Sequence, residues 1–169
     1  GFLSKEELEI GSHYYHLMHR RDLNNIDDPL SNNNDSCFYG DCFTDSILMK
    51  KLKKMEEETN IELYPTYSFT RVYTYNADLK KHKDRPSCEI SVTVNWESDG
   101  PEWPIYMDGK PIITAPGDAV IYLGCELPHW RDNFKGDFQI QSFLHYVDKN
   151  GLHKHYKYDK RPYLINPEK

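Results

Sequence analysis

The spacing of apolar residues predicts two amphipathic helices in the N-terminal third of the chain. Ser4 is followed three residues later by Glu7, which is a capping-box pattern, and we expect a helix over about 4–21. In the stretch SILMKKLKKMEEETN, apolar side chains share one helical face opposite Lys and Glu, which indicates a second helix near Asp45. Residues 22–36 are rich in Asn and Asp and lack apolar periodicity, so we expect a surface loop there.

Beyond residue 63 the pattern changes to short alternating or β-branched runs separated by Gly, Asp, Asn and Pro. Six such runs predict strands, at 66–75, 88–96, 104–107, 110–114, 118–123 and 137–147. The order of elements indicates a mainly β protein with flanking helices, namely a double-stranded β-helix (jelly-roll) barrel with the N-terminal helices packed outside. We expect a single domain over 1–169, divided into a helical part of about 4–60, a jelly-roll core of about 64–147 and a basic tail, 148–169.

Composition narrows the class of protein. The chain has 169 residues, a net charge of -6 and 14% aromatic residues, which suits a β-rich enzyme or binding module and makes a nucleic-acid partner unlikely. We interpret the basic tail as a solvated face rather than an anion site. No apolar run approaches the ~20 residues of a membrane span, so we expect a soluble, cytoplasmic protein without a membrane partner. The four cysteines are irregularly spaced and predict free thiols.

Three residues have the chemistry of a metal site. His82 and Asp84 lie two positions apart just before the strand predicted at 88–96, and we expect the pleat to direct both side chains inward. His129 follows the run APGDAVIYLGCELP and supplies a second imidazole. Two imidazoles and one carboxylate form the facial triad of non-haem Fe(II) enzymes. The other histidines are expected on the surface or in structural roles: His13, His16, His19, His145, His153 and His155.

The segments around these residues resemble the prolyl-4-hydroxylase-like branch of the Fe(II)/2-oxoglutarate-dependent oxygenases. RVYTYNADLKKHKDR resembles its strand, polar turn and H-x-D motif, APGDAVIYLGCELPHW its approach to the distal histidine, EISVTVNW its fourth jelly-roll strand, and FLSKEELE its first helix. The resemblance implies that His82, Asp84 and His129 bind Fe(II) and that Tyr73 contacts 2-oxoglutarate. It also implies a dioxygenase that uses O₂ to hydroxylate an unactivated C–H bond, with release of succinate and CO₂.

One position departs from the family pattern. The family places Arg or Lys about ten residues beyond the distal histidine to hold the far carboxylate of 2-oxoglutarate, whereas this chain has Gln139 and Gln141 in that region. A buried dicarboxylate still needs a charged partner. We favour Arg131, which should face inward, and then Arg71; Arg85 ranks third because strand parity should point it away. Gln141 would add a neutral hydrogen bond.

The substrate class and the catalytic role stay open at this point. The small size of the chain favours a small molecule or a short peptide as substrate, and retention of Asp84 argues against a halogenase. The alternative is a non-catalytic cupin-like metal-binding module in which the same three residues hold a metal and no 2-oxoglutarate enters. Ser91, Thr93 and Asn95 are expected in the cavity, with Val92 and Val94 under the helices. The tryptophans are expected as core or rim residues, or as a substrate wall: Trp96, Trp103 and Trp130.

Overall fold

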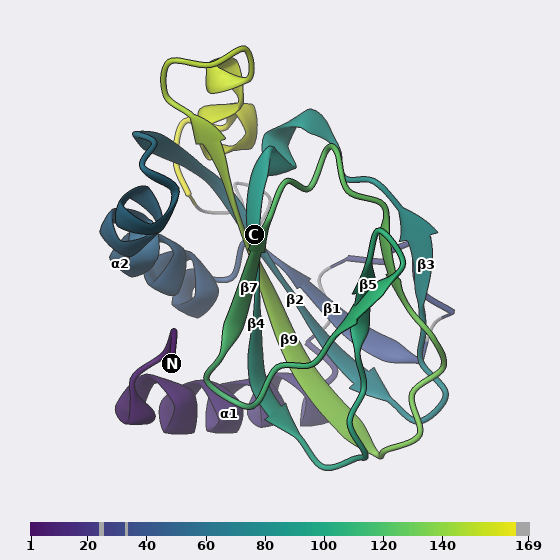
Figure 1. Ribbon diagram of the computed structural model, residues 1–169. Helices are drawn as coiled ribbons and strands as arrows, with labels where there is room; N and C mark the ends of the chain where they lie inside the picture. The colour runs from purple at the N-terminus through teal and green to yellow at the C-terminus, as the bar shows by residue number, and fades with distance from the viewer. Residues whose placement is uncertain (24–25, 33, 165–169) are drawn as a thin grey trace.

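The computed structural model describes residues 1–23, 26–32 and 34–164. Two α-helices precede or interrupt a series of nine strands (Figure 1). In chain order the elements are α1 (Lys5–Arg20), β1 (Asp35–Tyr39), α2 (Cys42–Thr59), β2 (Leu63–Thr74), β3 (Leu79–His82), the 3₁₀ turn η1 (Pro86–Cys88), β4 (Ile90–Ser98), β5 (Ile105–Met107), β6 (Lys110–Ile112), β7 (Ala119–Tyr122), β8 (His129–Arg131), β9 (Phe138–Asp148) and the 3₁₀ segment η2 (Lys154–Lys160). Within the described ranges, no helix has the length and apolar character needed to cross a membrane.

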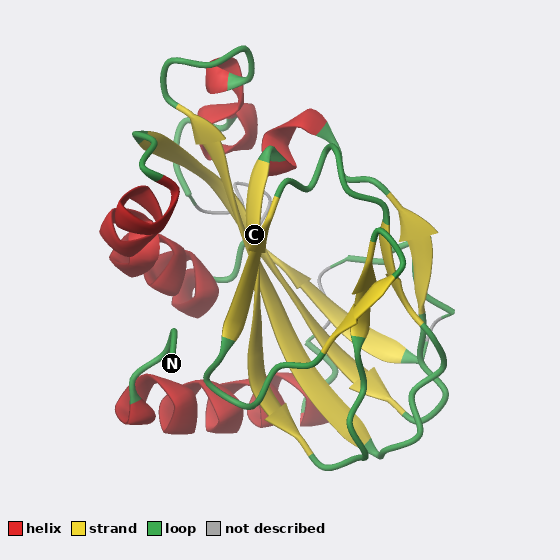
Figure 2. Cartoon of the chain, in the orientation of Figure 1, coloured by secondary structure: helices red, strands yellow, loops and turns green. Residues whose placement is uncertain are grey.

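The strands form two antiparallel sheets. The larger has the order β1-β2-β9-β4-β7 and the smaller the order β3-β8-β5-β6. Both helices cover one face of the larger sheet, and the smaller sheet lies on its other side (Figure 2). The prediction of a mainly β protein with flanking helices is therefore confirmed, and the site described below lies between the two sheets.

The alternation of side chains in β4 separates the hydrophobic core from the interior between the sheets. Val92 and Val94 are fully buried in the main core cluster with helix residues Tyr15 and Leu48, as predicted. Trp96 belongs to the same side of the strand and is 1% exposed, so of its two expected positions it takes the one in the core and not the one in a substrate wall. The alternate residues of β4 occupy the opposite face of the sheet, because a strand has a side-chain period of two: Ser91, Thr93 and Asn95.

The first helix begins with the expected capping box and is fixed to the second helix by a buried ion pair. Ser4 Oγ accepts from Glu7 N at 3.2 Å, and Ser4 N donates to Glu7 Oε2 at 2.7 Å. Lys51 Nζ lies 2.7 Å from the same Oε2, and both side chains are at most 10% exposed. Burial alone would raise the pKa of Glu7, but the hydrogen bonds from Lys51, Lys50 and the Ser4 backbone lower this pKa to about 2.

We predict that Glu7→Gln lowers the free energy of unfolding at neutral pH by about 2 kcal/mol, because Lys51 stays buried without its charged partner. The folded-state pKa of Glu7 is depressed, so this stabilisation is complete above the ordinary value of 4.5 and is lost as the pH falls through about 2. Urea unfolding at pH 7 and pH 3 measures the effect, and the difference between wild type and variant should narrow at pH 3. Glu6→Gln, an exposed residue of the same turn, is the control.

Three short strands were not predicted. β1 begins inside the segment 22–36 that was expected to be a surface loop, and residues 24, 25 and 33 of that segment lie outside the described part. β3 and β8 have four and three residues and contain Lys, His and Arg rather than an apolar alternation. They pair with each other, with His82 opposite His129. Both imidazoles of the predicted triad are therefore carried by strands that hydropathy does not reveal.

The tail is more than a solvated face. Its described part continues to Leu164, while 165–169 lie outside the described residues. η2 packs against β2. Asp159 in η2 accepts two hydrogen bonds from Arg85, both at 2.7 Å. The Tyr39 hydroxyl donates to the same carboxylate at 2.5 Å. The tail thus holds residues that border the candidate site.

Candidate metal centre and adjoining pocket

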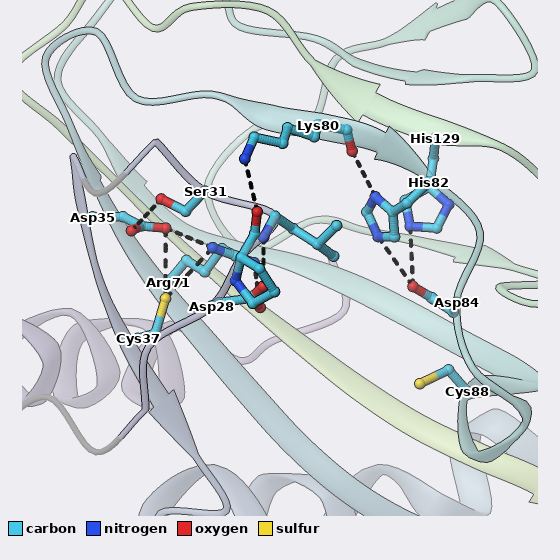
Figure 3. A network of polar contacts seen from close by, with 12 residues as sticks. Asp28, Ser31, Asp35, Cys37, Arg71, Lys80, His82, Asp84, Cys88 and His129 are labelled. Carbon is cyan, nitrogen blue, oxygen red and sulfur yellow. Dashed lines mark hydrogen bonds and ion pairs between the residues drawn. The ribbon is translucent and has the colours of Figure 1, made fainter.

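His82, Asp84 and His129 come together between the two sheets (Figure 3). His82 Nε2 lies 3.3 Å and His129 Nε2 lies 3.4 Å from Asp84 Oδ1, and the two imidazole centroids are 4.3 Å apart. One ligand atom from each residue lies within 4.8 Å of the others. Two imidazole nitrogens and one carboxylate oxygen at this spacing can share a divalent cation.

Both imidazoles are held in the tautomer that a metal requires. His82 Nδ1 lies 2.7 Å from the Lys80 carbonyl oxygen, and His129 Nδ1 lies 2.8 Å from the Leu127 carbonyl oxygen. A carbonyl oxygen only accepts, so each Nδ1 carries a hydrogen and each Nε2 is the nitrogen that faces Asp84. In the metal-free chain an Nε2 hydrogen can be donated to this carboxylate, and a metal ion would replace it. The backbone therefore orients both ligands without any metal.

The electrostatics of the cluster also favour a cation. Burial alone would raise the pKa of Asp84, but hydrogen bonds from His129 and His82 hold this pKa well below its usual range. Burial alone would lower the pKa of His129, whereas the hydrogen bond and charge of Asp84 raise it. Asp84 Oδ2 is buried and has no hydrogen-bond partner within the described residues. An ionised, incompletely paired carboxylate between two imidazoles is suited to a metal ion.

The backbone around Asp84 differs from the strand that we expected. His82 ends β3, and Asp84 lies in the loop before η1, so the pleat argument for two inward side chains is wrong. Asp84 is placed instead by its backbone, since its N–H donates to the Gly124 carbonyl at 2.9 Å. A Cβ at Gly124 would lie 2.4 Å from Asp84 Oδ2 and 2.4 Å from the carbonyl oxygen of Cys88. Gly124 therefore leaves the room that the carboxylate needs.

We predict that Gly124→Ala weakens metal binding by ~10–100-fold, because the new methyl group displaces the Asp84 carboxylate. Calorimetric titration of the purified chain with Mn(II) measures this affinity. Gly109→Ala is the control, because it strains the backbone, where φ is +81°, without bringing a Cβ within 4 Å of any atom. Equal Mn(II) affinity in the two variants would contradict the steric role of Gly124.

A pocket of about 360 Å³ opens beside the three residues. Its walls combine aromatic rings with charged side chains, and the described part of the loop after α1, from Ile26 to Leu30, contributes to its lining. The rings that line it come from the inner face of the larger sheet: Tyr39, Tyr67, Phe69, Tyr122 and Phe143. Such a chamber can hold a mainly apolar group next to a metal.

Two of the three candidate arginines line this pocket, and both are neutralised by acids of the chain itself. Arg71 donates to Asp28 and to Asp35, each at 2.6 Å, which fastens the rim loop to the sheet (Figure 3). Arg85 makes the paired contact to Asp159 and lies 4.5 Å above the Tyr67 ring. The expectation that Arg85 points away from the site is wrong, because residues 83–85 do not belong to a strand.

Arg131 has a different environment. It is 2% exposed, donates to the Trp103 carbonyl at 2.7 Å and packs over the Trp103 ring, while its Nε has no hydrogen-bond partner in the described residues. Within the described part of the chain no ion pair includes Arg131. Burial lowers its pKa to about 10, with Tyr73 and Tyr122 acting in the opposite direction. This guanidinium is a buried cation without an anion.

Tyr73 shares the surroundings of Arg131 and also has an unsatisfied polar atom. Its ring is fully buried at 4.9 Å from the Trp103 ring, and its hydroxyl has no hydrogen-bond partner among the described residues. Gln141 is buried nearby on β9, directly across from Arg71 on β2, and donates to Thr93 at 3.1 Å. Neither Tyr73 nor Arg131 belongs to the lining of the aromatic pocket. The unsatisfied polar atoms of Tyr73 and Arg131 therefore lie outside this pocket, in the buried interior around Trp103.

Sequence reasoning missed two side chains at the centre. His145, which was expected to be structural or solvent-facing, is 4% exposed and lines the pocket, and Cys88 is 2% exposed beside Asp84. The sequence contains a sign that His145 faces the site: it lies four residues beyond Gln141 in β9, and a side-chain period of two puts both residues on the same face. For Cys88 the sequence has no comparable signal, since η1 is a single turn.

Comparison of the sequence with known families and with curated proteins gives no match. Solved structures do match. A prolyl-4-hydroxylase from Pseudomonas putida has a TM-score of 0.61 at 16% identity, covering 85% of this chain and 88% of the other. For a Trichoplax adhaerens prolyl hydroxylase in complex with a hypoxia inducible factor peptide, the TM-score is 0.65 at 14% identity, with 88% and 81% covered.

A third structure widens the range of reactions found on this fold. The non-haem α-ketoglutarate-dependent epimerase SnoN, from nogalamycin biosynthesis, has a TM-score of 0.69 at 8% identity, covering 88% of this chain and 75% of the other. At such low identities these likenesses establish the fold: the chain has the jelly-roll fold of the 2-oxoglutarate-dependent Fe(II) oxygenases. What it catalyses has to be argued from its own residues.

Proposed function

We propose that this chain is an Fe(II)- and 2-oxoglutarate-dependent oxygenase that hydroxylates an unactivated C–H bond of a small molecule or a peptide. The observation that carries the proposal is the convergence of His82, Asp84 and His129, with both Nε2 atoms facing one carboxylate oxygen. This is the ligand set of non-haem Fe(II) oxygenases, and it occurs here in the fold of that class. The buried guanidinium of Arg131, which has no acid beside it in the described residues, also supports the proposal, because a module that binds only a metal would not need it.

The three ligands fit iron by the chemistry of their donor atoms. When bound, Fe(II) would activate O₂, which oxidises both 2-oxoglutarate, to succinate and CO₂, and a C–H bond, to an alcohol. His82 and His129 would hold the ion through nitrogens whose tautomers the backbone has already set. Asp84 would supply the negative charge, leaving part of the coordination sphere to co-substrate and O₂.

Arg131 and Tyr73 fit the far carboxylate of 2-oxoglutarate. A buried guanidinium lacking an anion and a buried hydroxyl lacking a partner are both satisfied by one carboxylate group. Arg71 is the weaker candidate because Asp28 and Asp35 already neutralise it. Gln141 would complete the polar wall. A carboxylate bound to Arg131 would also neutralise the charge of its buried guanidinium.

The aromatic pocket would receive the group to be oxidised. Its rings exclude water from the metal face, and its rim loop is fixed through Arg71 and Asp28. A volume of about 360 Å³ suits a small molecule or one side chain of a peptide. The Trichoplax prolyl hydroxylase is in complex with a peptide, which supports a peptide as one of the two substrate classes to test.

The test is spectroscopic and independent of substrate. Under anaerobic conditions, Fe(II) plus 2-oxoglutarate should give the visible charge-transfer band of the chelate, and admission of O₂ should give slow uncoupled formation of succinate. Absence of both signals would favour the cupin-like binding module instead. A positive result would justify a screen of amino acids, peptides and small molecules for stimulated turnover, with a product heavier by one oxygen separating hydroxylation from epimerisation.

A further inference from the structure

A second cluster of metal-ligand side chains lies beside the triad and shares Asp84 with it. Asp84, Cys88 and His145 bring one carboxylate oxygen, one thiol sulfur and one imidazole nitrogen within 4.8 Å of one another. Figure 3 shows Cys88 next to Asp84, on the side away from His82 and His129. The proposed oxygenase chemistry uses neither Cys88 nor His145, although both are almost fully buried.

The hydrogen bonds of His145 set it as a ligand in the same way as the other two histidines. Ser91 Oγ donates its hydrogen to the Cys88 carbonyl at 3.0 Å, so it accepts from His145 Nδ1 at 2.8 Å. The lone pair of His145 is therefore on Nε2. A partner that fixes the distal nitrogen is the usual second contact of a metal-bound imidazole.

Asp84 has an oxygen to spare for this cluster. Oδ1 faces the two imidazoles of the triad, whereas Oδ2 is buried and has no hydrogen-bond partner within the described part of the chain. Leaving a buried carboxylate oxygen unpartnered costs free energy, and a cation on this side would remove that cost. One carboxylate can present its two oxygens to two different ions.

We propose that Asp84, Cys88 and His145 form a second metal site that takes a thiophilic divalent ion of the Zn²⁺ or Cd²⁺ class. A thiolate, an imidazole and a carboxylate are zinc ligands, and the sulfur separates this site from the oxygen and nitrogen donors of the triad. Binding transfers the Cys88 proton to solvent, after which the Tyr67 hydroxyl, 3.1 Å from the sulfur, donates to the thiolate. Asp84 and His145 both line the pocket, which gives the ion a route inward.

The site is tested on the metal-free chain with Cd²⁺ as the probe, because thiolate-to-cadmium charge transfer absorbs in the ultraviolet. The chain carries Cys42→Ser and Cys125→Ser, since Cys42 is exposed and Cys125 half-buried and both would add background. We expect a saturable band that is lost in Cys88→Ser and needs ~10-fold or more Cd²⁺ in His145→Gln. The band should persist in His82→Ala, which disrupts only the triad.

Cys37→Ser is the matched control, because Cys37 is a second buried thiol that lies beside Asp35 and Arg71 and is not one of the three proposed ligands. No band, or a band that survives in Cys88→Ser, overturns the proposal. If Cys88→Ser fails to fold by circular dichroism, an unchanged Cd²⁺ affinity in His145→Gln overturns it equally. The readout needs neither 2-oxoglutarate nor O₂, so its result is separate from that of the oxygenase test.

Discussion

His129→Ala is expected to abolish the anaerobic Fe(II)/2-oxoglutarate band and to reduce succinate formation by ~100-fold or more. His129 is 1% exposed, and its Nε2 is one of the two imidazole nitrogens that face Asp84 Oδ1 within the described residues. Removing it leaves one imidazole and one carboxylate, which is too few protein ligands to hold Fe(II) at working concentrations. The loss should therefore be of metal binding rather than of a later step.

Calorimetric titration with Mn(II), next to the spectroscopic assay, separates these two kinds of loss. His13→Ala is the matched control, since His13 is an exposed imidazole on α1 and should leave both signals unchanged. Circular dichroism shows whether the variant keeps its fold. Retention of Mn(II) affinity in folded His129→Ala would remove the basis of the proposed metal centre.

The parts of the fold that local patterns determine could be predicted from the sequence. The first helix was predicted from its capping box and the second from its apolar face of helical period. The second begins at Cys42, capped by Asp41, slightly before the predicted stretch. Long strands such as β2 and β9 were predicted from β-branched and aromatic runs. β3 and β8 could not be, because LKKH and HWR form strands only through pairing with each other and with distant partners.

The same distinction applies to the candidate site. His82, Asp84 and His129 were selected by residue type and motif, but the path that brings Asp84 inward depends on Gly124, far along the chain. The sequence allowed a ranking of the three arginines, but it could not show which of them is already paired with an acid of the chain. What separates them is the position of acids distant in sequence: Asp28 and Asp35 beside Arg71, and Asp159 beside Arg85.

Arg131→Met is expected to weaken 2-oxoglutarate binding by at least about 2 kcal/mol, or about 30-fold, while the metal-free protein becomes no less stable. Binding of 2-oxoglutarate and stability of the fold should respond differently, because Arg131 is a buried cation without an acid beside it in the described residues. In the metal-free chain, burial disfavours its charged form and lowers its pKa to about 10. Methionine has similar length and removes that electrostatic cost, so the fold loses mainly the hydrogen bond to Trp103.

Arg71→Met should show the reverse combination. Its removal leaves Asp28 and Asp35 without their shared partner, so unfolding should occur at lower urea concentration, while the KM for 2-oxoglutarate changes little. Urea unfolding of both metal-free variants, together with the KM from uncoupled succinate formation, distinguishes the two arginines. A raised KM in Arg71→Met with a normal KM in Arg131→Met would transfer the carboxylate contact to Arg71. The buried guanidinium of Arg131 would then need a different anion to balance it.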